Sequence, residues 1–121
     1  MTENQKLWVE ALRSGKYLQG KERLVQKDGP NITYCCLGVA CKLYEEATKE
    51  QLPLDSCGQY WVAEETLADL PKVQQFFGLK TENGHIPSMK ISLTQLNDTG
   101  KTFDEIASII EQHRKELFEE E

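Results

Sequence analysis

The sequence lacks the short motifs that identify several common enzyme classes. It contains no phosphate-binding loop, no G-x-G-x-x-G, no H-E-x-x-H and no G-x-S-x-G motif. Histidine is scarce, since the chain has two, His85 and His113. A cysteine nucleophile would need one of them as its base, and the sequence does not establish that either lies beside a cysteine. We therefore predict no catalytic residues and expect a binding protein rather than an enzyme.

Long apolar stretches are also missing. No run approaches the roughly 20 apolar residues that a membrane-spanning helix needs. The first residues, MTENQKLW, lack the apolar core of a signal peptide. We expect no membrane partner, and a cytoplasmic location in which thiols stay reduced.

Positive charge is in short supply. The 121 residues carry 14 lysines and arginines against 20 aspartates and glutamates, which gives a net charge of −6. Unspecific binding to a nucleic-acid backbone requires a basic face, so we expect no nucleic-acid partner. The reverse case stays open, in which an acidic surface imitates nucleic acid toward a DNA-binding protein.

The four cysteines, Cys35, Cys36, Cys41 and Cys57, lack the paired spacing of zinc ligands. Adjacent cysteines on a strand point to opposite faces, so Cys35 and Cys36 cannot both face one metal ion. We predict no metal site and no cofactor. These cysteines are best explained as small apolar side chains buried in the core. Apolar surroundings raise the pKa of a thiol and so make it less reactive.

The densest apolar run is YCCLGVACKL, from Tyr34 to Leu43. It reads as the end of a strand followed by a buried helix from Leu37 to Glu46, whose apolar residues recur at helical spacing. Gly38 lies near the start of this helix, where a missing side chain permits close packing. We interpret the segment as the core helix. An alternative is that a strand running into a helix leaves N–H groups free for an anion.

A hairpin is predicted just before this helix. Leu24 and Val25 begin a strand, Asp28 to Asn31 form a turn, and Ile32 to Cys35 return as a second strand. The segment Gly15–Gly29 is the one cationic concentration in the acidic chain. Its basic residues are Lys16, Lys21, Arg23 and Lys27, with Arg13 just before them. They form either a solvated edge or a contact for a phosphate or carboxylate.

Helical periodicity and capping patterns predict the remaining elements. The last two helices each begin with a capping box, S-x-x-Q or T-x-x-E. We predict an α+β fold in one domain spanning residues 1–121, with four or five helices packed on a short antiparallel β-hairpin or small sheet. The first expected element is a helix from Glu3 to Ser14 with its stripe Leu7, Trp8, Ala11 and Leu12. Gln59 to Val62 form either a short strand or an aromatic cover for the core. The elements expected after them are a helix from Pro71 to Phe77 ended by Gly78, a turn or loose hairpin from Lys80 to Met89 centred on Asn83-Gly84, a helix opened by Ser92, and a helix opened by Thr102 that continues through Phe103, Ile106, Ala107, Ile110, His113 and Leu117.

One polar group stands out in the last third, where Asn97 and Asp98 precede Gly100. Turn chemistry explains both residues by hydrogen bonds to nearby backbone groups. The alternative is that they line a pocket facing the hairpin and the core helix, where Asp98 accepts from a ligand. The candidate ligand-binding residues are Arg23, Tyr34, Cys35, Asn97 and Asp98.

Four blocks of sequence, taken together, resemble a family of small uncharacterised proteins from bacteriophages and prophages. The blocks run from Tyr17 to Leu24, from Tyr34 to Cys41, from Leu70 to Leu79 and from Leu93 to Glu111, and include YCCLGVAC and LNDTGKTFDEIA. The resemblance implies a small accessory protein acting in the cytoplasm of an infected bacterium. It implies no activity and no site residues.

Three functional hypotheses follow. The leading one is a phage-derived, non-enzymatic protein that binds a small anionic metabolite, such as a nucleotide signal. A role in counter-defence is inferred by analogy with the way phages use such small proteins. The first alternative is an acidic interaction module that docks on and inhibits a host protein. The second is a small cysteine-dependent enzyme. A homodimer is also compatible with the sequence, with Trp8, Leu117 and Phe118 as interface candidates.

Overall fold

The apolar run at Tyr34–Leu43 forms the centre of the molecule, as predicted. The computed structural model describes residues 1–52 and 66–119, so the strand expected at Gln59–Val62 and the side chain of Cys57 lie outside them. The described part has six helices and two small sheets, which confirms an α+β fold. The elements are α1 (Glu3–Arg13), β1 (Leu18–Gln19), β2 (Val25–Asp28), β3 (Asn31–Tyr34), α2 (Cys36–Thr48), α3 (Pro71–Phe77), β4 (His85–Ile86), β5 (Ile91–Ser92), α4 (Leu93–Asp98), α5 (Phe103–Gln112) and α6 (Arg114–Leu117).

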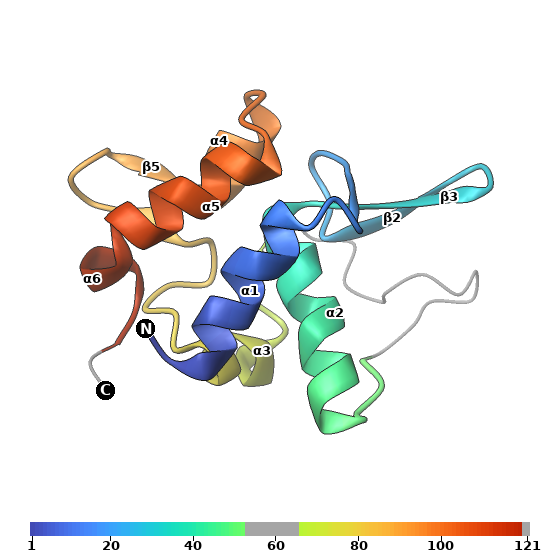
Figure 1. The fold of residues 1–121 in the computed structure, drawn as a ribbon, viewed down its shortest axis with the longest axis horizontal. Coiled ribbons are helices and arrows are strands. Elements are labelled where there is room, and N and C mark those ends of the chain that lie inside the picture. Colours follow the sequence, from blue (N-terminus) through green and yellow to red (C-terminus); the bar gives the residue numbers. More distant parts are fainter. Residues whose placement is uncertain (53–65, 120–121) are drawn as a thin grey trace.

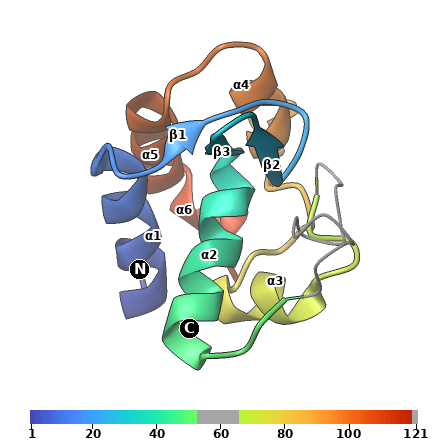
Figure 2. The same ribbon diagram turned by 90° about the vertical axis from the view of Figure 1, so that its right-hand side faces the viewer.

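Helix α2 is the core helix, and α1, α3 and α4 pack against it. Its first six residues, Cys36 to Cys41, are all buried because they are small or apolar and face packed elements on every side. Figure 2 shows the three-stranded sheet at the N-terminal end of α2, with α1 on one side of the helix and α3 on the other. Helix α5 packs on α1 from the side away from α2 (Figure 1).

The predicted hairpin is confirmed as the antiparallel pair β2–β3. The sheet has a third strand, β1, which pairs in parallel with β3 and puts that strand in the middle. In Figure 1 the hairpin projects away from the helices. Strand β1 was not predicted, because a strand of two residues is too short to show alternation of apolar and polar side chains.

Gly38 holds the hairpin close to α2. A Cβ atom at this position would overlap the carbonyl oxygen of Leu24 and lie 2.6 Å from its carbonyl carbon. The same oxygen accepts a hydrogen bond from the N–H of Cys35 at 3.1 Å. The close packing that we expected at Gly38 is therefore confirmed, and its partner is the backbone just before β2.

The capping predictions are confirmed. Ser92 and Gln95 form a reciprocal capping box that begins α4, and Thr102 and Glu105 form another that begins α5. Each satisfies two backbone N–H groups that a helix start otherwise leaves without partners. A capping box not predicted from sequence joins Thr2 to Gln5 at the start of α1.

Pro71 opens α3 and Gly78 ends it in the left-handed conformation, with φ of +70°, as expected. The hairpin expected around Asn83-Gly84 lies further along the chain, since β4 and β5 pair Ile86 with Ile91. Gly84 instead lies against Leu93, where a Cβ would come within 2.7 Å of that side chain. Its role is a close contact rather than the tip of a hairpin.

The predicted length of the last helix was wrong. It ends at Gln112, and His113 separates it from the single turn α6. Beyond that turn, Phe118 pairs with Leu79 in an isolated antiparallel bridge, and the N–H of Glu119 donates to the carbonyl of Gly78 at 2.7 Å. A straight helix could not bring Phe118 back to this bridge, so the chain bends at His113.

The suggested dimer interface was also wrong, because Trp8, Leu117 and Phe118 are all buried in the core of the chain. Trp8 contacts the rings of Phe77 and Phe118 at centroid distances of 5.5 and 6.3 Å. The stripe on α1 is rotated from the predicted one, since Leu7 is 43% exposed and Val9 is buried. In the described ranges, none of the helices combines the length and apolar character needed to cross a bilayer.

Candidate functional site

Asn97, at the end of α4, is the fully buried centre of a polar network. Its side-chain oxygen accepts from the N–H of Cys36 at 3.2 Å and from Nε2 of Gln19 at 3.0 Å. Its amide nitrogen donates to the carbonyl of Gly20 at 2.8 Å. One side chain therefore joins α4 to the start of α2 and to β1.

Gln19 extends the network to the turn between α4 and α5. Its Nε2 also donates to the carbonyl of Lys101 at 2.8 Å, and its Oε1 accepts from the N–H of Phe103 at 3.2 Å. Gln19 is not among the residues predicted from the sequence. It lies on a strand without a recognisable pattern, and its partners are far away in sequence.

A hollow of about 230 Å³ lies beside this network. Two of the residues that line it are lysines, Lys21 from the segment after β1 and Lys101 from the turn before α5. Both are exposed. Nζ of Lys101 lies 3.7 Å from a carboxylate oxygen of Glu105, a long and exposed ion pair. The described residues that line the hollow are Gln19, Gly20, Lys21, Asn97, Gly100 and Lys101.

Two of the predicted site residues belong to this region. Asn97 lines the hollow, and its oxygen and nitrogen bond to backbone groups 61 and 77 positions away rather than to groups of its own turn. Asp98 is half-buried and accepts from the N–H of Glu22 at 2.8 Å. That bond holds Glu22 in a left-handed conformation with φ of +69°. Asp98 therefore shapes the loop that carries Lys21.

The other three predicted site residues are not among those that line the hollow. Arg23 is exposed on the loop before β2. Tyr34 packs edge-on against Tyr17 at a centroid distance of 5.3 Å. Burial raises the pKa of both phenols. Cys35 is buried at the N-cap of α2, and burial raises the pKa of its thiol to about 12.

The start of α2 is closed to an anion. The N–H of Cys36 donates to Asn97, and Cys36 has no exposed surface. Its carbonyl accepts from the indole N–H of Trp8 at 3.0 Å. The interpretation of this segment as a core helix therefore holds, and the alternative of an anion at its N-terminus does not.

The described thiols have the environment of packed apolar groups. Burial raises the pKa of Cys36 and of Cys41 well above the ordinary value. The thiol of Cys36 lies 3.6 Å from the carbonyl of Leu93. Such thiols carry almost no thiolate at neutral pH and so are poor nucleophiles. Within residues 1–52 and 66–119, no three metal-ligating side chains gather into a cluster.

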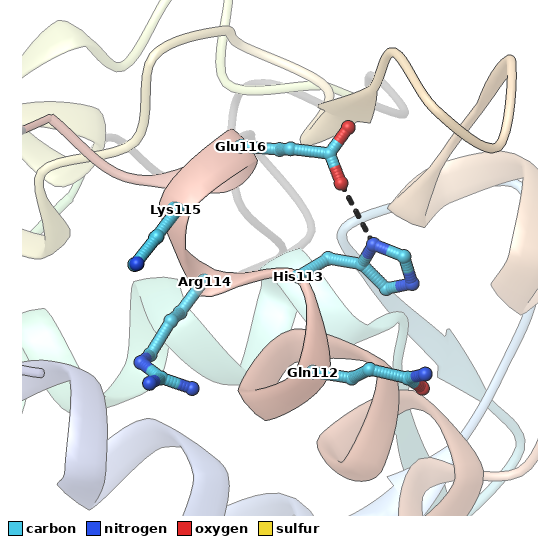
Figure 3. Close-up of a pocket in the computed structure, with 5 residues that line it drawn as sticks. All are labelled: Gln112, His113, Arg114, Lys115 and Glu116. Atoms are coloured by element: carbon cyan, nitrogen blue, oxygen red, sulfur yellow. Dashed lines mark hydrogen bonds and ion pairs between the residues drawn. The ribbon is translucent and has the colours of Figure 1, made fainter.

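A second hollow, of about 260 Å³, lies at the bend between α5 and α6 (Figure 3). Nδ1 of His113 lies 2.8 Å from Glu116, and the same carboxylate accepts from the N–H and the hydroxyl of Ser88 at 2.8 Å each. In Figure 3, Arg114 and Lys115 extend away from this pair. The hydrogen bonds from His113 and Ser88 lower the pKa of Glu116 to about 2.

The order of these groups decides their chemistry. In a nucleophilic triad the histidine lies between the hydroxyl and the carboxylate. Here Glu116 lies between Ser88 and His113, and a carboxylate with so low a pKa is a weak base. The pair fastens the bend to the loop before β5, and His113 is a partly buried side chain with a hydrogen-bond partner.

The chain belongs to the family described as a domain of unknown function, DUF8296, whose model matches residues 1–114. No curated protein and no solved structure matches it. The bacteriophage origin that the sequence blocks imply stays a prediction.

Proposed function

We propose that this protein is a non-enzymatic binding protein for a small anionic ligand, and that the hollow beside Asn97 is its binding site. The observation that carries the proposal is that Lys21 and Lys101, from distant parts of the chain, line the same hollow. Each ammonium group offers three hydrogen-bond donors and a positive charge to a ligand between them.

The floor of the hollow is fixed before any ligand arrives. Asn97 and Gln19 bind the backbone at Gly20 and at Lys101 through hydrogen bonds of 2.8 Å. The N–H of Lys101 also donates to the carbonyl of Leu96 at 3.1 Å. Because the backbone that carries the lysines is anchored, binding orders little beyond their side chains, and this lowers the entropic cost.

The described residues favour binding over catalysis. Their three thiols are buried with raised pKa values, and the one histidine–carboxylate pair has its carboxylate in the middle position. A counter-defence role would follow if the natural ligand were a nucleotide signal.

Titration by ¹H–¹⁵N NMR with inorganic phosphate and with acetate tests the proposal. We expect saturable shifts of the amide signals of Gly20, Lys21 and Gly100. Lys21→Ala and Lys101→Ala should each weaken binding at least about fivefold, because each removes a charged donor. Lys27→Ala is the matched control, since Lys27 is an exposed lysine on β2 away from the hollow.

The proposal fails if neither anion shifts these signals, or if Lys27→Ala weakens binding as much as Lys21→Ala. The first result would favour the alternative of an acidic interaction module on a host protein. The second would mean that the whole basic segment attracts anions without a defined site. If Arg23→Ala weakened anion binding and neither lysine variant did, the binding site would instead lie on the loop before β2.

A further inference from the structure

We propose that the hollow holds a phosphate monoester group in its doubly charged form, with the rest of the ligand lying outside. This inference rests on the proposed function and adds the chemical class of the ligand. Three features of the hollow support it, namely its size, the number of its charged groups, and the kind of side chain found among its lining residues.

The size of the hollow suits one compact group. Sites that enclose a drug-sized ligand have volumes of about 300–1,000 Å³, and a water molecule takes about 30 Å³. The hollow has about 230 Å³ and opens to solvent. A tetrahedral phosphate with a few waters fits this space, whereas a complete nucleotide would extend well beyond it.

The charge of the hollow suits a dianion. Two lysines, Lys21 and Lys101, are among its described lining residues, and no aspartate or glutamate is. A singly charged ligand balances one of them, and a dianion balances both. Two carboxylates lie close by in the chain. Asp98 accepts from the N–H of Glu22. Glu105 accepts from the N–H of Thr102 at 3.1 Å and also forms a long, exposed ion pair with Lys101 at 3.7 Å, so a dianion has to compete with it for that ammonium group.

No aromatic ring is among the described residues that line the hollow. The nearby candidate from the sequence, Tyr34, packs against Tyr17 instead. Proteins that hold a nucleobase commonly stack it on an aromatic side chain. We therefore expect the phosphate group alone to set the affinity, with little contribution from a base.

Methyl phosphate and dimethyl phosphate test the charge requirement, because they differ by one methyl group. The monoester loses its second proton with a pKa of about 6, whereas the diester keeps a single charge. We expect methyl phosphate to bind about fivefold tighter at pH 7.5, and this advantage to fall to about twofold at pH 5.5, where most of the monoester is singly charged.

The diester is also the control for the protein. The acidic residues next to the lining residues, Glu22, Asp98 and Glu105, meet both esters alike. The ratio of the two affinities therefore isolates the charge of the ligand. Lys27→Ala should leave this ratio unchanged, and the double variant of Lys21→Ala with Lys101→Ala should bring it to about one.

Two further probes separate the sources of the phosphate group. The affinity for inorganic phosphate measures the contribution of the phosphate group alone, and the affinity for adenosine 5′-monophosphate adds the contribution of a base and a ribose. We expect both to bind within about threefold of methyl phosphate, since one exposed contact changes affinity by no more than that. Adenosine 5′-monophosphate binding more than about tenfold tighter would overturn the inference, because the base would then be held.

Equal binding of the two methyl esters at pH 7.5 would also overturn the inference while leaving the proposed function intact. Failure of every anion to bind would instead refute the proposed function itself. The two failures are therefore distinguishable in one set of titrations.

Discussion

The side-chain oxygen of Asn97 accepts a hydrogen bond from the backbone N–H of Cys36 at 3.2 Å, and both residues are fully buried. The bond joins the end of α4 to the first turn of α2. The carbonyl of Cys36 accepts from Trp8 on α1. Three helices therefore meet at one residue of the apolar run, which is why this segment organises the fold.

Loss of the Asn97 side chain should destabilise the protein strongly. Asn97→Ala leaves the N–H of Cys36 and the carbonyl of Gly20 without their partner. Buried polar groups without partners cost about 1–3 kcal/mol each, so we expect a loss of about 2–4 kcal/mol. Urea unfolding followed by circular dichroism measures it. Gln75→Ala, at an exposed site on α3, should change stability by less than about 0.5 kcal/mol, and a similar small effect of Asn97→Ala would refute the structural role.

A side chain at Gly38 should be more damaging than one at a glycine in open space. Gly38→Ala places a methyl group inside the backbone of Leu24, which cannot move without breaking its bond to Cys35. We expect a cost of more than about 3 kcal/mol. Gly15→Ala meets no atom within 4 Å and costs about 1 kcal/mol through its φ of +75°. Thermal unfolding of both variants checks the difference, and equal costs would contradict the close approach.

Local patterns predicted much of this fold because their physics is local. The boxes at Ser92 and Thr102 satisfy backbone groups within three residues, so the sequence contains the complete motif. Gly38 stood out because a glycine in an apolar helix needs a packing reason. The hairpin followed from its turn residues.

Long-range pairings escaped prediction for the opposite reason. Gln19 and Asn97 are separated by 78 positions, and no periodicity relates a strand of two residues to the end of a helix. The pocket proposed for Asn97 was a reasonable location, but Arg23 and Tyr34 were assigned to it by type alone. The bend at His113 depends on the bridge between Leu79 and Phe118, which helical spacing cannot reveal.

The described thiols should be inert in the folded protein. Cys35, Cys36 and Cys41 are buried, and the pKa of Cys35 is raised to about 12. In a Cys57→Ser background, iodoacetamide at pH 7.5 should modify these three only as fast as the protein unfolds. Mass spectrometry of timed samples, with and without urea, measures the rates. One thiol reacting in native protein at a rate independent of stability would revive the cysteine-enzyme hypothesis.

The bend at His113 should weaken in acid. The pKa of Glu116 falls from an ordinary 4.5 to about 2 in the fold, so its contribution is present above pH 4.5 and is lost as pH falls toward 2. Glu116→Gln should lower the thermal midpoint at pH 6, and this difference should shrink to less than about half at pH 3. Glu82→Gln, at an exposed glutamate, is the control. A difference that stays constant with pH would mean that the charge of Glu116 is not involved.

Removing the charge of Glu105 should strengthen anion binding, a result that few surface substitutions would produce. Glu105 lies 3.7 Å from Lys101 and competes with a ligand for that ammonium group. Glu105→Gln removes the competing charge and keeps the capping box, because glutamine serves at this position as well as glutamate. We expect methyl phosphate to bind about twofold to fivefold tighter at low salt, and the gain to fade at high salt.

Asp104→Asn is the matched control for this last prediction, since it removes one negative charge from the neighbouring position of α5. The carboxylate of Asp104 contributes to raising the pKa of Arg13. If binding responds only to net charge, both variants will tighten it equally. If the hollow is the site, Glu105→Gln alone will do so, because Lys101 is the ammonium group that it releases. Calorimetric titration of both variants at two salt concentrations therefore tests whether Lys101 contacts the ligand directly.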